Sequence, residues 1–155
     1  MSSRADVGAA LQEVVDDLLR ATGASRCTLR RDVPGDEFFP VTHEALAPGA
    51  GSLRGERSVD LRSQPVVRQL AETRRQVVQD DCREAFADPA FQRMLETYGG
   101  LGAQIVTPVH DGGRLAAILS LHQLGAPRAW TEDEIELAAA AAERVRGLLE
   151  REAAP

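Results

Sequence analysis

The clearest pattern in the chain is a pair of apolar runs joined by a short polar turn. Residues 103–109 and 115–121 are almost continuously apolar, and the sequence His-Asp-Gly-Gly-Arg separates them. Glycines supply the positive φ angles that tight turns need, so this spacing predicts an antiparallel hairpin. Strands with so little polar alternation are typical of a sheet that is covered on both faces.

Both ends of the chain carry apolar residues at helical spacing. In each case the steps are three and four residues, which places the apolar side chains on one face of a helix. The residues are Val7, Leu11, Val14 and Leu18 near the start, and Ile135, Ala138, Ala142, Val145 and Leu149 near the end. Gly23 ends the first predicted helix, 7–21, and Thr131 with Glu134 forms a capping box for the second, 131–150.

The segment between these features predicts several short elements. Residues 25–31 alternate apolar and polar, as a half-buried strand does, and 38–43 reads as a second strand that Pro40 confines to an edge. Residues 44–62 show no period and predict a loop.

Two short helices and one more strand follow this loop. Ser63 and Pro65 predict the start of a helix that ends by Arg75, before a strand at 76–79. Asp88-Pro89 starts the next helix, Gly99-Gly100 closes it, and its apolar stripe is Phe91, Met94, Leu95 and Tyr98.

This order of elements predicts an α+β fold. We expect a central antiparallel sheet of five or six strands, with the terminal helices on one face and the short helices and loops on the other. The sequence shows no internal repeat and no linker between hydrophobic clusters. It therefore predicts a single domain over residues 1–155, with a core of about 5–150.

Composition narrows the function. The 155 residues carry a net charge of −6, so the chain has no positive field to attract nucleic acid. The N-terminus has no apolar signal region, and no run approaches the ~18 apolar residues that span a bilayer. We therefore expect a cytoplasmic protein with no nucleic-acid or membrane partner, in which Cys27 and Cys82 are free thiols.

Two local motifs, in this order of elements, resemble the GAF domain family over nearly the whole chain. The first is the strand and turn Gln-Ile-Val-Thr-Pro-Val-His-Asp-Gly-Gly at 104–113, and the second is Trp-Thr-Glu-Asp-Glu-Ile-Glu-Leu at 130–137. The resemblance implies a sensory module that binds a small molecule and has no catalytic apparatus. It also implies a homodimer through the terminal helices and an output that acts on a signalling partner in trans.

The segment that follows the second apolar run resembles bilin-binding GAF domains more narrowly. Ser-Leu-His-Gln at 120–123, followed by Pro-Arg-Ala-Trp at 127–130, is similar to the corresponding part of phytochromes, where the His lines the chromophore pocket. The attachment cysteine of those proteins would fall at Phe91, which has no thiol for a thioether. We therefore expect no cofactor, and in particular no covalent bilin.

Other branches of the family fit less well. The chain contains no Asn, so the Asn-Lys motif of the cyclic-nucleotide branch is absent. The alternative is a thiol-dependent reductase of the methionine sulfoxide type, which would need Cys27 and Cys82 close in space. The three histidines fall in a strand, a turn and a strand end that diverge, so we expect no metal site.

The candidate ligand-binding residues are polar or aromatic groups in otherwise apolar elements. A buried amide or imidazole needs a partner, which can be backbone, water or a ligand. The candidates are Phe91, Tyr98, Gln104, Ser120 and His122. The alternative is that the stripe containing Phe91 and Tyr98 serves only as core. If a ligand binds, we expect it between the hairpin and the 88–98 helix.

Overall fold

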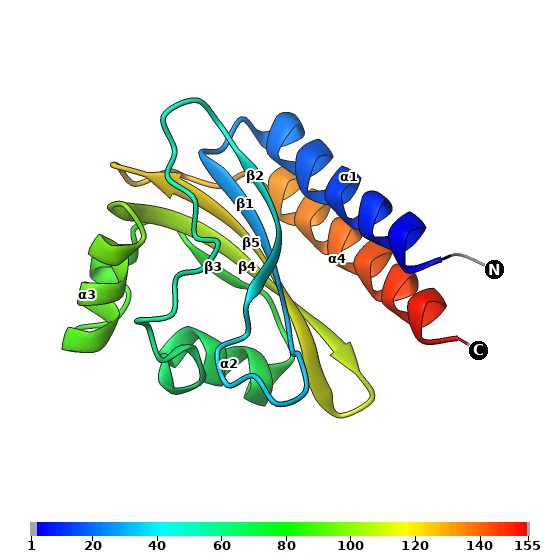
Figure 1. Cartoon of the computed structure of the whole chain (residues 1–155). Helices are drawn as coiled ribbons and strands as arrows, with labels where there is room; N and C mark the ends of the chain where they lie inside the picture. The colour runs from blue at the N-terminus through cyan, green and yellow to red at the C-terminus, as the bar shows by residue number, and fades with distance from the viewer. Residues whose placement is uncertain (1–2, 155) are drawn as a thin grey trace.

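A five-stranded antiparallel sheet lies at the centre of the computed structural model, which describes residues 3–154 (Figure 1). The strands follow the spatial order β2-β1-β5-β4-β3. Their bounds are β1 (Arg26–Arg31), β2 (Val41–Leu46), β3 (Val77–Gln79), β4 (Leu101–Asp111) and β5 (Arg114–Leu124). The prediction of an α+β fold on an antiparallel sheet is confirmed.

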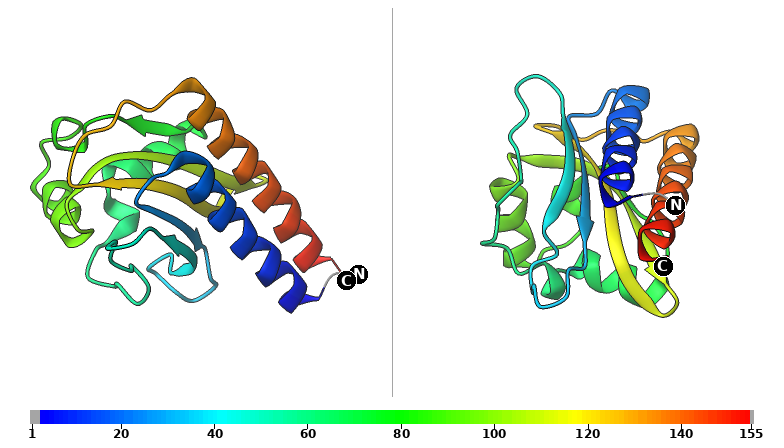
Figure 2. Two further views of the ribbon diagram at one scale, coloured as in Figure 1. Left: turned by 90° about the horizontal axis from the view of Figure 1, so that it is seen from above. Right: turned by 45° about the vertical axis from the view of Figure 1, so that its right-hand side comes forward.

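The two terminal helices lie side by side on one face of this sheet, as predicted (Figures 1 and 2). Helix α1 (Arg4–Thr22) ends at Gly23, whose φ of 65° is left-handed, and α4 (Glu132–Ala153) begins with the predicted capping box. Their apolar stripes pack on the sheet rather than facing outward. We call this side of the sheet the helix face.

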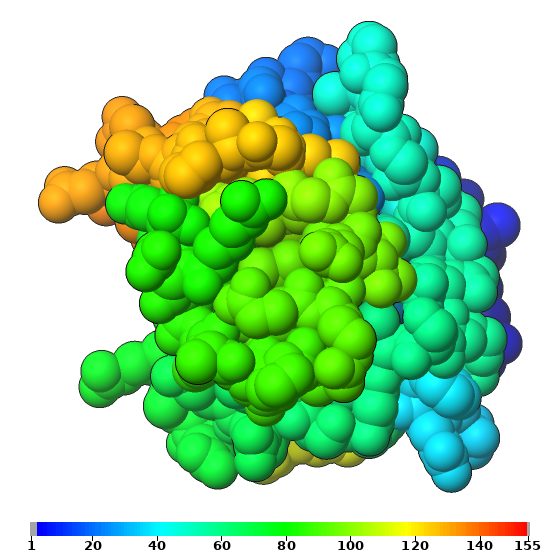
Figure 3. Space-filling model, turned by 90° about the vertical axis from the view of Figure 1, so that its left-hand side faces the viewer, coloured from blue at the N-terminus to red at the C-terminus, as the bar shows by residue number. Residues whose placement is uncertain are grey.

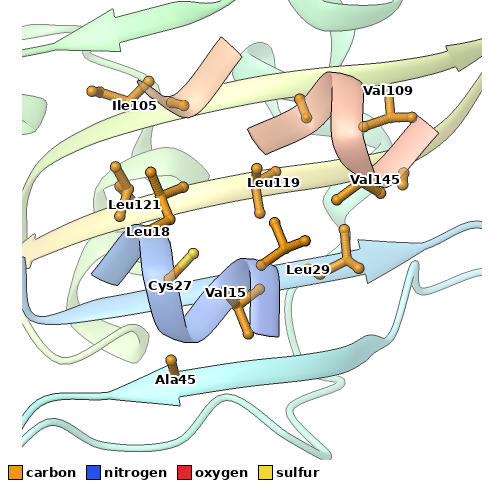
Figure 4. Packing of buried hydrophobic residues seen from close by; sticks show 14 of the residues in the cluster. Val15, Leu18, Cys27, Leu29, Ala45, Ile105, Val109, Leu119, Leu121 and Val145 are labelled. Carbon is orange, nitrogen blue, oxygen red and sulfur yellow. The ribbon is translucent and has the colours of Figure 1, made fainter. Parts of the chain in front are cut away.

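The helix face is filled by aliphatic side chains from every layer. Figure 4 shows Val15 and Leu18 of α1 and Val145 of α4 packed over the face of the strands that carries Leu29 and Leu119. All five are at most 4% exposed. Burial of this size supplies most of the stabilising free energy of such a domain.

Shorter elements cover the opposite side of the sheet, which we call the cover face. They are α2 (Pro65–Thr73), α3 (Pro89–Thr97), the 3₁₀ turns at Leu61–Ser63 and Cys82–Glu84, and the irregular segment 47–60. Together we call them the cover, and Figure 3 shows α3 and the segment 47–60 from outside. They enclose a second apolar cluster that includes Phe39, Leu70 and Phe91.

Several predicted boundaries are wrong. The predicted loop 44–62 is shorter in the structure, because β2 continues to Leu46 and a 3₁₀ turn begins at Leu61. The second strand begins at Val41 rather than at residue 38, because Phe39 turns with a φ of 46° and buries its ring in the second cluster. The cap of α2 is Gln64 and not Ser63, whose hydroxyl instead donates to the Asp60 carbonyl within the preceding turn. In these last two places loop packing displaced the start of a regular element.

The hairpin strands are longer than predicted, since β4 and β5 have eleven residues each and only Gly112 and Gly113 lie between them. Among the helices formed by residues 3–154, none is long and apolar enough to cross a membrane.

Candidate functional site

A row of polar side chains crosses the cover face of the sheet. Gln79 of β3 pairs with Gln104 of β4, Gln104 pairs with His122 of β5, and His122 pairs with Arg26 of β1. Residues paired across neighbouring strands project to the same side of a sheet. All four are buried, so four neighbouring strands place one polar group each at the same level of an apolar interior.

Hydrogen bonds within the row determine the state of His122. Gln104 Nε2 donates to Gln79 Oε1 at 2.8 Å, and Arg26 Nε donates to His122 Nδ1 at 2.9 Å. Since Nδ1 accepts, the neutral ring carries its proton on Nε2. Burial, and then the charges of Arg26 and Arg30, hold the pKa of His122 well below its usual value. At neutral pH the ring is therefore an uncharged donor through Nε2.

Tyr98, at the end of α3, connects the cover to the central strands. Its carbonyl accepts from Arg26 Nη2 at 2.8 Å, and its phenol oxygen accepts from Arg30 Nη2 at 3.1 Å. Its ring stacks on the His122 ring, with centroids 6.1 Å apart and planes inclined at 27°. Burial raises the pKa of the phenol. A movement of α3 would thus alter the contacts of Tyr98 with Arg26, Arg30 and His122.

A cavity of about 40 Å³ lies between these groups and the cover. Its polar lining is Arg30, Gln64, Tyr98, Gln104, Ser120 and His122, and its apolar lining is Leu61, Val66, Val67, Met94, Val106 and Ile118. A cavity of this volume has room for a few small atoms, since one water needs roughly 10–15 Å³ by the same kind of measure.

Four of the five candidate residues meet at this cavity. Tyr98, Gln104, Ser120 and His122 all line it, and Ser120 and His122 point to the same side of β5, as strand alternation predicts. Phe91 lies outside the lining. It is fully buried in the second cluster, with its ring edge-on to Phe86 at 5.1 Å.

The sequence reasoning missed Arg26, Arg30 and Gln64. Charged residues in a strand normally face solvent, so the half-buried strand predicted over 25–31 implies exposed arginines. The alternation in Arg-Cys-Thr-Leu-Arg at 26–30 did carry the signal, because it places both arginines on the face opposite Cys27 and Leu29. In a central strand of a sheet covered on both sides, that face is also buried.

The two thiols lie on opposite faces of the sheet. Cys27 belongs to the core beneath the terminal helices, and Cys82 belongs to the cluster under the cover. Burial raises the pKa of both thiols, that of Cys82 to about 12. The structure therefore gives no support to the reductase alternative. Within residues 3–154, no group of three or more His, Cys, Asp or Glu is placed to hold a metal ion.

Comparison with protein families identifies the chain. The GAF domain model matches residues 6–148. The chain belongs to the GAF domain family. This confirms the resemblance seen in the strand and turn at 104–113 and in the start of α4. We found no significant match among curated proteins.

Solved GAF structures share the fold of this chain. The cyanobacteriochrome receptor PixJ is 22% identical with a TM-score of 0.77, covering 95% of this chain and 97% of that one. The phycocyanobilin-bound GAF domain of a cyanobacterial phytochrome is 16% identical with a TM-score of 0.78, covering 94% and 85%. A far-red-absorbing domain with bound biliverdin IXα is 19% identical with a TM-score of 0.77, covering 95% and 91%.

These structures correct the expectation of no cofactor. That expectation relied on the missing thiol at Phe91. Several of the similar GAF structures contain a bound bilin, which is phycocyanobilin, phycoerythrobilin or biliverdin. A missing attachment residue removes one bond to a pigment and not the pocket around it. The absence of Cys at this position was therefore too narrow a basis for excluding a cofactor.

Proposed function

We propose that this GAF domain is a sensory module that binds a small molecule between the sheet and the cover. The observation that carries the proposal is the buried polar row beside the cavity, above all the Nε2–H group of His122. Arg26 donates to the opposite ring nitrogen, Nδ1, which leaves Nε2–H as the ring atom that can donate to a ligand in the cavity that His122 lines. Ligand sites of proteins commonly combine an apolar wall with a few such oriented polar groups.

The signal would be a displacement of the cover. At about 40 Å³ the cavity is smaller than the roughly 300–1,000 Å³ of typical ligand pockets, so a larger ligand binds only when the cover moves outward. The cover is built for such movement, because it consists of two nine-residue helices, two single turns and the irregular segment 47–60. A ligand that favours the open form shifts the population toward it.

The first test is thermal unfolding against a metabolite library, with the parent chain and two variants. His122→Ala removes the donor, and Tyr98→Phe removes the phenol oxygen that Arg30 contacts. Loss of one hydrogen bond should weaken a discovered ligand about two- to tenfold. Arg20→Gln, on the exposed part of α1, is the matched control and should bind like the parent. Equal binding by all four proteins would place the ligand elsewhere.

A bilin is the ligand class that the similar solved structures favour. Co-expression with enzymes that make biliverdin or phycocyanobilin should give a coloured protein, measured as visible absorption of the purified chain. The resemblance to bilin-binding GAF domains places Phe91, which has no thiol, where those domains carry the attachment cysteine. A pigment bound without a thioether should be released by denaturation in acidic urea. A colourless protein under all these conditions would remove bilins from consideration and leave the smaller metabolites.

The homodimer and the partner in trans stay predictions. The apolar stripes on α1 and α4 are buried within the chain itself, so any pairing of copies would use the outer sides of these helices, where Leu137 is 42% exposed. Light scattering of the parent chain and of Leu137→Glu measures this. A parent of monomeric mass would end the dimer proposal.

A further inference from the structure

Arg30 is a buried cation that faces the cavity without a counter-ion. It is 5% exposed, and its Nη1 and Nη2 atoms donate to the Phe39 carbonyl and the Tyr98 hydroxyl, which are both neutral. None of the ion pairs formed by residues 3–154 includes Arg30 or Arg26. A buried charge that lacks a partner of opposite sign is costly.

The nearest acids are engaged elsewhere. Glu44 accepts from the Ser52 hydroxyl and from the Leu53 amide at 2.7 Å, and Glu56 accepts from the amide and hydroxyl of Ser58. Both carboxylates therefore act on Arg30 only over a distance. The effect of burial on Arg30 is larger than the attraction of these two carboxylates, and it lowers the pKa of the guanidinium. An anion bound beside Arg30 would therefore stabilise its charge.

Gln64 supplies a second unpaired polar group on the same cavity. Its side chain is 5% exposed, and its Oε1 atom has no hydrogen-bond partner. Half a turn of the amide exchanges Oε1 for Nε2 and presents two N–H donors. With His122 Nε2–H and the Ser120 hydroxyl, the lining then offers donors from several sides. The described lining residues include Arg30 and no Asp or Glu.

We propose that the ligand of this cavity carries a carboxylate, bound by the Arg30 guanidinium with the Gln64 amide and His122 Nε2–H as further donors. The planar guanidinium matches a carboxylate through paired hydrogen bonds. The cavity volume suits a group of about three heavy atoms. This inference rests on the proposed function, because it names the chemical class that the same site binds.

The carboxylate can belong to a small free acid or to the acid side chain of a larger molecule. Formate and formamide test the first case, a small free acid, because the two molecules have nearly the same size and differ in charge. At constant ionic strength, formate should raise the melting temperature of the parent chain and formamide should not. Arg30→Gln should weaken formate at least about tenfold. Arg31→Gln, one residue away and paired with Glu152, should behave like the parent.

Biliverdin IXα and its dimethyl ester test the second case, an acid side chain of a larger molecule, because esterification removes both carboxylates and keeps the pigment. If the carboxylate of a larger molecule is what binds, the acid should bind at least about tenfold more tightly than the ester, and Arg30→Gln should remove that difference. The comparison of acid with ester uses the unaltered chain, so it holds even if Arg30→Gln does not fold.

The outcomes distinguish the inference from the proposed function. Two results would show that the cavity binds ligands but not through an anionic group. Either formamide or the dimethyl ester binds the parent as tightly as the matching acid, or Arg30→Gln binds the acids as tightly as the parent does. The inference then fails and the proposed function stands. If neither the acids nor any neutral compound of the library changes the melting temperature, both fail.

Discussion

The two faces of β1 differ in what their burial achieves. Cys27 and Leu29 point to the helix face and join a core of aliphatic groups, where removal from water is favourable by itself. Arg26 and Arg30 alternate with them, point to the cover face and are equally buried. Burying two guanidinium groups opposes stability. Burial of the helix face is therefore favourable by itself, whereas burial of the arginines on the cover face carries a cost, which we attribute to the proposed ligand-binding role.

The elements that close the two faces differ in the same way. The helix face lies under two long helices of 19 and 22 residues that also pack on each other. The cover face lies under helices of nine residues and an irregular segment. Segments with fewer buried contacts open at lower free-energy cost. This difference agrees with the proposal that the cover, and not the pair of terminal helices, moves when a ligand binds.

The largest expected effect contrasts neighbouring residues of β5. Leu119 packs on the helix face and Ser120 lines the cavity. Leu119→Ala should lower the free energy of unfolding by about 2–5 kcal/mol, because it leaves a void in a closely packed core. Ser120→Ala should change it by about 1 kcal/mol or less and should instead alter ligand affinity. Urea unfolding measures both. Similar losses for the two variants would contradict the distinction between the faces.

A smaller loss of stability is expected from a substitution at Gly102 of β4, where the backbone of another segment lies very close. A Cβ atom added at Gly102 would lie 2.1 Å from the carbonyl oxygen of Ala126, which is backbone and has little freedom to move. Gly102→Ala should therefore cost about 1–3 kcal/mol in the same unfolding assay. Gly8→Ala, in α1 with open space around it, should be stabilising by about 0.5–1 kcal/mol. An unchanged free energy of unfolding in Gly102→Ala would show that the backbone at Ala126 can shift to accommodate the added methyl group.

The smallest effect is a dependence of stability on pH that belongs to the cover face. Arg26, Arg30 and Tyr98 surround His122, and its folded pKa lies below that of the unfolded chain. Stability is then constant above about pH 6.5 and falls below it, because only the unfolded state takes up the proton. One such group contributes up to about 1.4 kcal/mol per pH unit.

Variants isolate this contribution from those of the other histidines. His43 and His110 also have lowered pKa values, so the parent should lose stability below pH 6.5 through all three. His122→Gln should reduce the slope more than His43→Gln, since His43 is only half-buried. Urea unfolding at pH 5.0, 6.0 and 7.5 gives the comparison. An unchanged slope in His122→Gln would mean that the ring takes up a proton in the folded state.

The regular elements could be predicted where one periodicity runs long enough. The stripes of α1 and α4 and the apolar hairpin strands gave both element type and layer, because each pattern repeats over many residues. The start of β2 and the cap of α2 could not be predicted, since Phe39 and the turn at Leu61–Ser63 follow from packing against distant residues.

The site was accessible from the sequence only in part. Gln104 and His122 stood out because they are polar residues in apolar strands, and both line the cavity. Arg26 and Arg30 did not, because a charge in a short strand is usually exposed. Phe91 shows the opposite limit: a helical stripe tells which residues are buried, but not which of them face a cavity.

Hydrogen exchange of backbone amides tests the central claim, that ligand binds on the cover face, most directly. Exchange would be compared without ligand and with saturating biliverdin IXα or the best ligand from the thermal screen. We predict a change in exchange in α2, α3 and the segment 47–60, where the ligand contacts and displaces the cover, with α1 and α4 unchanged. Protection confined to α1 and α4 would contradict the account, because it would place the ligand against the terminal helices.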